Sequence, residues 1–172
     1  IPDYAKVLNR GMKGIQADIE EKLAKLDFGS SEGLSQWYFY QAASLCLKGM
    51  MLLAQRYASL ARKMAKEAPD LARKEELERI AQTCERVPAN PARNFYEAIQ
   101  AVWFTQLGVW METPIALFGP PGRFTQYMYP LYKKDKEEGR LTDEEAIDFI
   151  HLYFIKINHL AMVLSPHTWA WN

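Results

Sequence analysis

The sequence carries no excess of either charge, because 21 lysine and arginine residues are balanced by 21 aspartate and glutamate residues. Nucleic acids and anionic membrane surfaces bind proteins through an excess of basic side chains, so we expect neither as a partner. Long apolar runs are missing as well. The run around 50–54 lies between Lys48 and Arg56 and is far too short to span a bilayer.

Cysteine is scarce in this chain. Cys46 and Cys84 are its only cysteines, and both fall within helical patterns without forming a Cys-x-x-Cys pair. A structural disulfide or a zinc site is therefore not expected. Together with the lack of a recognisable signal peptide, this predicts a protein of the reducing cytoplasm.

The sequence also lacks a self-contained set of catalytic or metal-binding residues. Asp148 and His151 have the i, i+3 spacing of ligands in carboxylate-bridged di-iron bundles, but His159 has no acidic partner at that spacing. No Gly-x-Ser-x-Gly sequence accompanies the histidines. The segment 119–123, Gly-Pro-Pro-Gly-Arg, is no phosphate loop, because proline has no N–H to donate to phosphate. From the residues alone we expect no metal and assign no catalytic residue.

Helical periodicity of apolar residues runs through most of the chain and predicts a mostly α fold. With 172 residues, the chain fits a single domain of ordinary size. Candidate N-caps are Asp3, Asn94 with Glu97 three residues later, and Thr142 with Glu145 at the same spacing. We expect helices over residues 3–28, 33–66, 70–86, 94–113 and 143–160.

Some of these stretches are apolar on almost every side, namely the first half of 33–66 and the whole of 94–113 and 143–160. A helix of this kind is buried by neighbours on most of its faces. We therefore expect 94–113 and 143–160 to be deeply buried and to pack near each other. The charges of 70–86 are most simply a solvated face.

An aromatic-rich corner at 120–135 is the most distinctive stretch. Pro120, Pro121 and Gly122 stop the preceding helix, because proline lacks an N–H and glycine does not resist a turn. Tyrosines follow on either side of Pro130, where we expect a second break. Such a corner either serves as scaffold or presents its loop to a cavity, and the residues alone favour the scaffold.

Particular stretches of this sequence resemble glycyl radical enzymes: CERVPANPARNFYEAIQAVWF at 84–104, PGRFTQYMYP at 121–130, GRLT at 139–142 and PDYAKVL at 2–8. They occur in the family's order and span essentially the whole chain. The second is most similar to the dehydratase and decarboxylase branch of this pyruvate formate-lyase-like family. The resemblance implies a helical segment of the glycyl radical α/β barrel, with residues 1–172 as one internal segment of the pyruvate formate-lyase-like domain.

The resemblance further implies an anaerobic lyase, dehydratase or decarboxylase that acts on a small organic substrate through a thiyl radical. In the family, that radical forms on a cysteine in a Gly-Cys-x-Glu loop, and a glycyl radical is held in an Arg-Val-x-Gly-Tyr loop. Neither loop sequence is present here, so both radical sites would lie outside this segment, which alone is expected to be inactive. A radical SAM activase would install the glycyl radical, and the whole enzyme would form a homodimer. The alternative is an independent helical scaffold or protein-interaction domain without catalysis.

Substrate-binding positions are also implied by the resemblance. Glycerol dehydratase-like members have a His-Ser pair just before the Pro-Gly-Arg-Phe corner, where this chain has Leu117 and Phe118. A second pocket position of the family falls near Trp169 and Trp171, for which core packing is an equally good interpretation. Loss of the polar pair predicts a substrate bulkier than glycerol or propane-1,2-diol, with an acid or aromatic acid favoured. Its anionic end would be bound by groups outside this segment.

Overall fold

The computed structural model describes residues 2–112 and 121–160, and within these ranges it contains six helices and no strand. The mostly α prediction is therefore confirmed. The helices are α1 (Tyr4–Leu23), α2 (Ser31–Lys66), α3 (Leu71–Arg86), α4 (Phe95–Glu112), α5 (Phe124–Glu137) and α6 (Asp143–His159).

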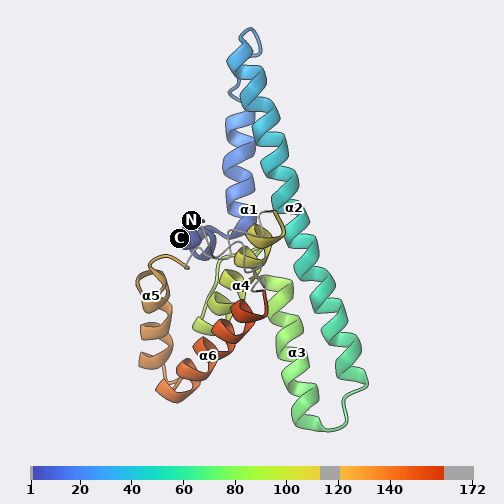
Figure 1. Ribbon diagram of the computed structural model, residues 1–172, viewed down its shortest axis with the longest axis vertical. Helices are drawn as coiled ribbons and strands as arrows, with labels where there is room; N and C mark the ends of the chain where they lie inside the picture. Colours follow the sequence, from blue (N-terminus) through green and yellow to red (C-terminus); the bar gives the residue numbers. More distant parts are fainter. Residues whose placement is uncertain (1, 113–120, 161–172) are drawn as a thin grey trace, which may run out of the picture.

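The long helix α2 runs the length of the molecule (Figure 1). α1 lies antiparallel to its first half and α3 antiparallel to its second half, where the α2–α3 contact is the most extensive between any two helices. α4 lies near the centre of the molecule and contacts each of the other five described helices. The first half of α2 and the second part of α1 form a hairpin that projects away from the remaining helices.

Most helices begin with a side-chain cap, which the sequence predicted at Asp3 and Thr142 but not at Ser30 and Asp70. Each cap oxygen accepts a backbone N–H that would otherwise lack a partner, a contact typically worth about 1 kcal/mol. The pairs are Asp3 with the N–H of Lys6, Ser30 with Gly33, Asp70 with Arg73, and Thr142 with Glu145. The capping box predicted at Thr142 and Glu145 is confirmed, because the Glu145 carboxylate accepts the Thr142 N–H at 2.9 Å in return.

The start of α4 differs from its predicted capping box. Asn94 caps the helix by accepting the Glu97 N–H at 2.8 Å. The Glu97 carboxylate, however, accepts the N–H of Arg93 at 2.8 Å rather than that of Asn94. A second cap comes from α5, where Asp135 accepts the N–H of Phe95 at 2.6 Å. Two separate elements thus fix the start of the helix.

The aromatic corner also departs from its prediction. Pro130 does not break the chain but lies inside α5. Proline removes one helical hydrogen bond, and the helix persists because buried Met128 and Asp135 anchor it to the core on both sides of that residue. The first turn, at 121–123, is present, with Gly122 at φ +65°.

A kink in α1 interrupts the helix expected over residues 3–28. Gly11 adopts φ +65° and a Cβ there would lie 2.5 Å from the Asn90 carbonyl carbon, so only glycine fits. The kink frees the N–H groups of Met12 and Lys13, which donate to the carbonyls of Pro88 and Ala89 at 2.8 and 3.0 Å. α1 therefore holds the loop between α3 and α4 by backbone contacts.

The main core surrounds α4, as expected. Its buried members are Tyr4, Leu8, Val87, Phe95, Ala98, Ala101, Val102, Met128, Leu141, Ala146 and Tyr153. The prediction that α4 and α6 pack together is confirmed by this cluster, which includes residues of both helices.

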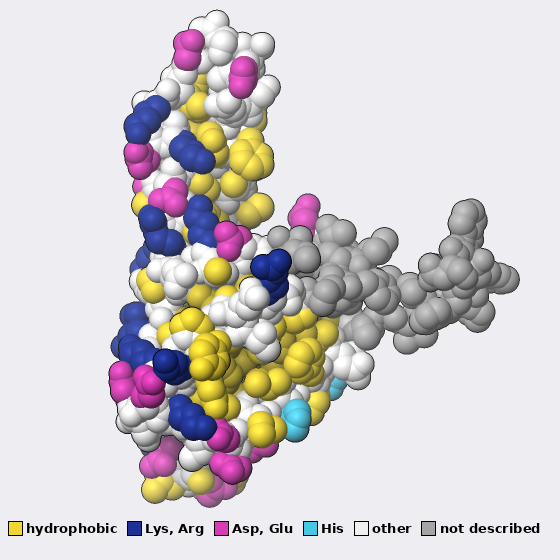
Figure 2. All heavy atoms as spheres, turned by 90° about the vertical axis from the view of Figure 1, so that its left-hand side faces the viewer, with side chains coloured by type: hydrophobic (Ala, Val, Ile, Leu, Met, Phe, Trp, Pro, Cys, Tyr) yellow, Lys and Arg dark blue, Asp and Glu magenta, His cyan; other side chains and the backbone are white. Residues whose placement is uncertain are grey.

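Deep burial of α6 and of the first half of α2 is not found. α6 buries only Ala146 and Tyr153, and leaves Ile147, Leu152 and Ile155 exposed. In α2 the exposed apolar side chains include Phe39 and Leu45. Figure 2 shows apolar side chains at the surface both of the upper hairpin and of the body below it. These faces have too few neighbours among the described residues to cover them.

Candidate functional site

The side chains expected to contact substrate lie outside the described residues. Leu117 and Phe118 fall between α4 and α5, and Trp169 and Trp171 follow α6 in the sequence. Their role stays a prediction. The structure describes the helices that flank these segments and the corner at 121–124, which directly follows the first of them.

A buried group of tyrosines lies beside this corner. We define the tyrosine cluster as Tyr4 of α1, Gln106 of α4, Tyr127 of α5 and Tyr153 of α6. Tyr4 and Tyr153 are each only 2% exposed, and Gln106 is 3% exposed. The Tyr4 and Tyr127 rings stack with centroids 5.4 Å apart, and the Tyr4 hydroxyl donates to Gln106 Oε1. Four helices therefore converge on one small polar group within an apolar core.

The corner itself is fastened by aromatic side chains. The Tyr127 hydroxyl donates to the carbonyl oxygen of Pro121 at 2.6 Å. Phe124 stacks on Tyr153 with ring centroids 5.4 Å apart. The expectation of a packed corner held in place by aromatics is confirmed.

The electrostatics of the tyrosine cluster favour neutral hydroxyls. Burial raises the pKa of Tyr4 to about 12. Burial, together with neighbouring tyrosines, raises the pKa of Tyr127 and of Tyr153 still further. These hydroxyls can donate hydrogen bonds at neutral pH but cannot serve as bases. The buried Tyr153 hydroxyl has no hydrogen-bond partner among the residues that the structure describes.

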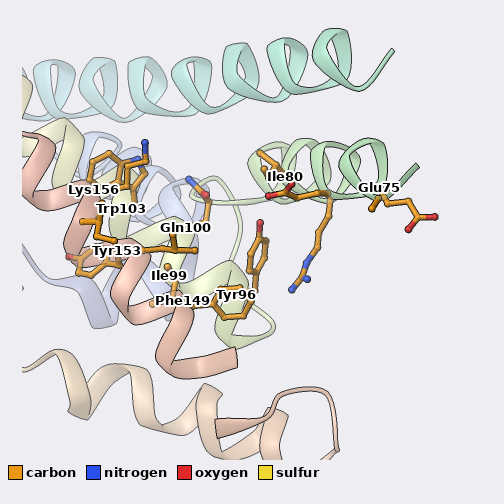
Figure 3. Close-up of a pocket in the computed structure, with 14 residues that line it drawn as sticks. Glu75, Ile80, Tyr96, Ile99, Gln100, Trp103, Phe149, Tyr153 and Lys156 are labelled. Atoms are coloured by element: carbon orange, nitrogen blue, oxygen red, sulfur yellow. The ribbon is translucent and has the colours of Figure 1, made fainter. Parts of the chain in front are cut away.

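A cleft of about 780 Å³ opens between α3, α4 and α6, and Tyr153 of the tyrosine cluster also lines it. Figure 3 shows Trp103, Tyr153 and Lys156 at one end of the cleft and Glu75 at the other, with Tyr96 and Phe149 between them. The Arg79 guanidinium lies 4.0 Å from the centroid of the Tyr96 ring, a cation–π contact. The cleft is thus largely aromatic and apolar with charges at its rim. It can hold an apolar group.

The two cysteines differ in their burial. Cys84 is buried against Ala54, Ala58 and Phe104. Burial, with a contribution from the charge of Glu85, raises the pKa of its thiol to about 11. Cys46 is exposed on α2. Both cysteines lie in helices, Cys46 in α2 and Cys84 in α3, as their sequence patterns predicted.

Metal ligands do not gather anywhere in residues 2–112 and 121–160, where no group of three or more His, Cys, Asp or Glu side chains could hold an ion. Asp148 and His151 are exposed on α6. Over the same residues, no helix is long and apolar enough to cross a membrane.

Sequence reasoning missed Tyr4, Gln106 and Tyr153 as members of a common cluster. Gln106 did carry a signal, since it is an amide within a mostly apolar helix and a buried amide needs a partner. The sequence could not show which residue supplies that partner, because Tyr4 lies 102 positions away along the chain.

Comparison with known proteins identifies the class. A family model described as pyruvate formate lyase-like matches residues 1–169. The chain belongs to the pyruvate formate-lyase-like family, which confirms the assignment made from the motifs at 2–8, 84–104, 121–130 and 139–142.

The chain is similar to a lyase, to a dehydratase and to a protein described as a glycyl radical enzyme. It is 41% identical to the isethionate sulfite-lyase of Bilophila wadsworthia over 174 aligned residues, which cover 100% of this chain and 21% of that enzyme. The structure matches the glycerol-bound, B12-independent glycerol dehydratase of Clostridium butyricum with a TM-score of 0.89 and 32% identity, over 96% of this chain and 21% of that one. A glycyl radical enzyme of Archaeoglobus fulgidus matches with a TM-score of 0.77 and 33% identity, over 86% of this chain and 19% of that one. The chain thus spans about one fifth of the length of these relatives.

Proposed function

We propose that this chain is one segment of a longer glycyl radical enzyme that breaks a bond in a small organic substrate by thiyl-radical chemistry. The observation that carries the proposal is the match over residues 1–169 to a family whose relatives include a lyase and a dehydratase. The family's cysteine and glycine loops are absent from this sequence. Its residues would therefore build the pocket wall, while the radical sites lie elsewhere in the polypeptide. The scaffold alternative finds no support in these relatives.

The substrate is proposed to be an organic acid rather than a neutral diol. Leu117 and Phe118 stand where glycerol dehydratase-like enzymes have a polar pair, and each lost hydrogen-bond partner costs a polyol about 1–3 kcal/mol. Trp169 or Trp171 would supply a second apolar wall. The resemblance to an enzyme named for isethionate, an organic anion, supports the same choice.

The test is a turnover panel with the full-length enzyme, activated anaerobically and checked for its glycyl radical by electron paramagnetic resonance. We expect turnover of isethionate or a carboxylic acid to exceed that of glycerol and propane-1,2-diol. Introducing Leu117→His with Phe118→Ser should shift preference toward the diols. Preferred turnover of glycerol by the unchanged enzyme, with no further gain in the double variant, would overturn the substrate proposal.

The two cysteines provide an independent check on where the chemistry occurs. Cys46→Ala and Cys84→Ala should each leave turnover in place, and Cys84→Ala should cost only packing stability, about 1 kcal/mol. Complete loss of turnover in either variant, with an unchanged glycyl radical signal, would show that this segment does carry the radical thiol.

The same proposal includes the partners of the whole protein. A radical SAM activase would generate the glycyl radical, the enzyme would be a homodimer, and it would reside in the cytoplasm. Activation by such an activase in an anaerobic extract, followed by the radical signal and by light scattering of the purified enzyme, tests the first two points.

A further inference from the structure

The corner at 121–124 is tied back onto its own helix. Tyr127 lies in the first turns of α5, and its hydroxyl reaches the Pro121 carbonyl oxygen at 2.6 Å. Gly122 makes the intervening turn at φ +65°. The Arg123 side chain makes no capping hydrogen bond to α5. The Tyr127 hydroxyl is therefore the side-chain contact that fixes the backbone where the corner begins.

The Tyr127 ring is held in turn by the start of the chain. It stacks on Tyr4, and the Tyr4 hydroxyl donates to Gln106. Gln106 belongs to α4, which precedes the corner in the sequence, whereas Tyr127 belongs to α5, which follows it. Tyr4 thus joins the helix before the corner to the helix after it.

A third side of the corner is supplied by α6. Phe124, the first residue of α5, lies between the Tyr127 ring at 5.8 Å and the Tyr153 ring at 5.4 Å, measured between centroids. Aromatic rings in such contacts have few conformations available, so they locate a neighbouring backbone well. Burial also keeps the Tyr4 and Tyr127 hydroxyls protonated, because it raises the pKa of both.

We propose that Tyr127, held by Tyr4, is a positioning residue that sets the backbone of the corner and thereby the geometry of substrate binding beside it. This inference rests on the proposed function. It assigns these tyrosines no part in the chemistry: they touch protein groups, and their effect on turnover passes through the Pro121 carbonyl.

The experiment compares Tyr127→Phe with wild type in the full-length, activated enzyme. This substitution removes only the hydroxyl and keeps the ring stacked on Tyr4. We expect kcat/KM per glycyl radical to fall about tenfold, the equivalent of one hydrogen bond of about 1.4 kcal/mol. We also expect backbone amides of 122–124 to exchange hydrogen about tenfold faster. A merely structural role would lower Tm but leave turnover per radical unchanged.

The matched control is Tyr129→Phe, which removes an exposed hydroxyl from the same helix. It should change neither kcat/KM nor amide exchange at the corner. Unchanged kcat/KM in Tyr127→Phe, or an equal loss in Tyr129→Phe, would overturn the proposal. If Tyr127→Phe does not fold, Tyr4→Phe takes its place, since it cuts the link to Gln106 and should lower kcat/KM in the same direction; no change there would also overturn it.

The failure of the proposed function can be told apart from the failure of this inference. Absence of any glycyl radical in the activated wild-type protein would reject the function. Amide exchange would then decide alone, since faster exchange confined to the corner in Tyr127→Phe supports the anchoring role and unchanged exchange rejects it.

Discussion

α4 and the first half of α2 are both apolar on nearly every face, yet α4 is largely buried and the first half of α2 is largely exposed. α4 is enclosed by α1, α5, α6 and the loop after α3, whereas the first half of α2 projects with its large side chains exposed. The polar residues distinguish them. Within α4, Glu97, Thr105 and Gln106 are buried and hydrogen-bonded, and Glu97 and Gln106 find their partners on other parts of this chain.

Apolar side chains therefore indicate only that a helix must be buried. Buried polar side chains also indicate which segment of the protein packs against it, because they need hydrogen-bond partners there. A buried amide or carboxylate must meet a particular partner, so it constrains the neighbour far more than a leucine does. The first half of α2 buries few side chains of any kind, so its residues do not indicate which segment would pack against it.

The difference between the two helices is tested most directly by replacing one phenylalanine in each of them with alanine in the 172-residue chain. Phe95 is 2% exposed and Phe39 is 68% exposed. Phe95→Ala should lower the free energy of unfolding by about 3–5 kcal/mol because it leaves a cavity. Phe39→Ala should change it by no more than about 0.5 kcal/mol. Urea denaturation measures both, and similar costs at the two positions would contradict the structure.

A smaller effect is expected from the charge at the start of α4. Burial alone would raise the pKa of Glu97, but hydrogen bonds and charge from Arg93, with the charge of Arg86, outweigh it and hold the pKa below its ordinary 4.5. Glu97→Gln should therefore cost about 2 kcal/mol at neutral pH, a value typical of a hydrogen-bonded charge.

The same variant has a definite pH dependence. Because the folded-state pKa of Glu97 is lowered, its stabilisation is fully present above the unfolded-state value and is lost as pH falls through the folded-state value. The difference in the free energy of unfolding between wild type and Glu97→Gln should thus disappear on acidification. Glu144→Gln, at an exposed position in the first turn of α6, serves as the control and should cost no more than about 0.5 kcal/mol at neutral pH. If that difference persisted at acid pH, the shape of the Glu97 side chain rather than its charge would account for the stabilisation.

The smallest change in stability, but a visible change in association, is expected on α2. Leu45 is exposed beside other apolar side chains of the projecting hairpin, which favours association in the isolated chain. Leu45→Lys should reduce the apparent mass in light scattering while altering the free energy of unfolding by no more than about 0.5 kcal/mol. Leu71→Lys, at an exposed position that opens α3, should not have this effect. A monodisperse wild-type monomer would contradict the expectation.

Five of the six helices could be predicted from apolar periodicity and caps, because these are local properties of the sequence. α5 was missed because Pro130 is a poor helix residue that tertiary contacts override. The kink at Gly11 could not be foreseen, since its cause is the distant loop around Asn90. The aromatic corner was predicted, but Tyr4 and Gln106, which complete the cluster beside it, are joined by a contact that spans much of the chain.

The kink at Gly11 has a consequence for the order in which the chain folds. Met12 and Lys13 donate to carbonyls of the loop that ends α3, so these bonds require that loop to be in place. The α2–α3 hairpin joins sequence neighbours and closes only a short turn, whereas docking α1 closes a much longer loop at a greater entropic cost. We therefore expect α2 and α3 to pair first and α1 to dock later. In pulse-labelled hydrogen exchange, the amides of Met12 and Lys13 would gain protection after those of α3, and simultaneous protection would contradict this order.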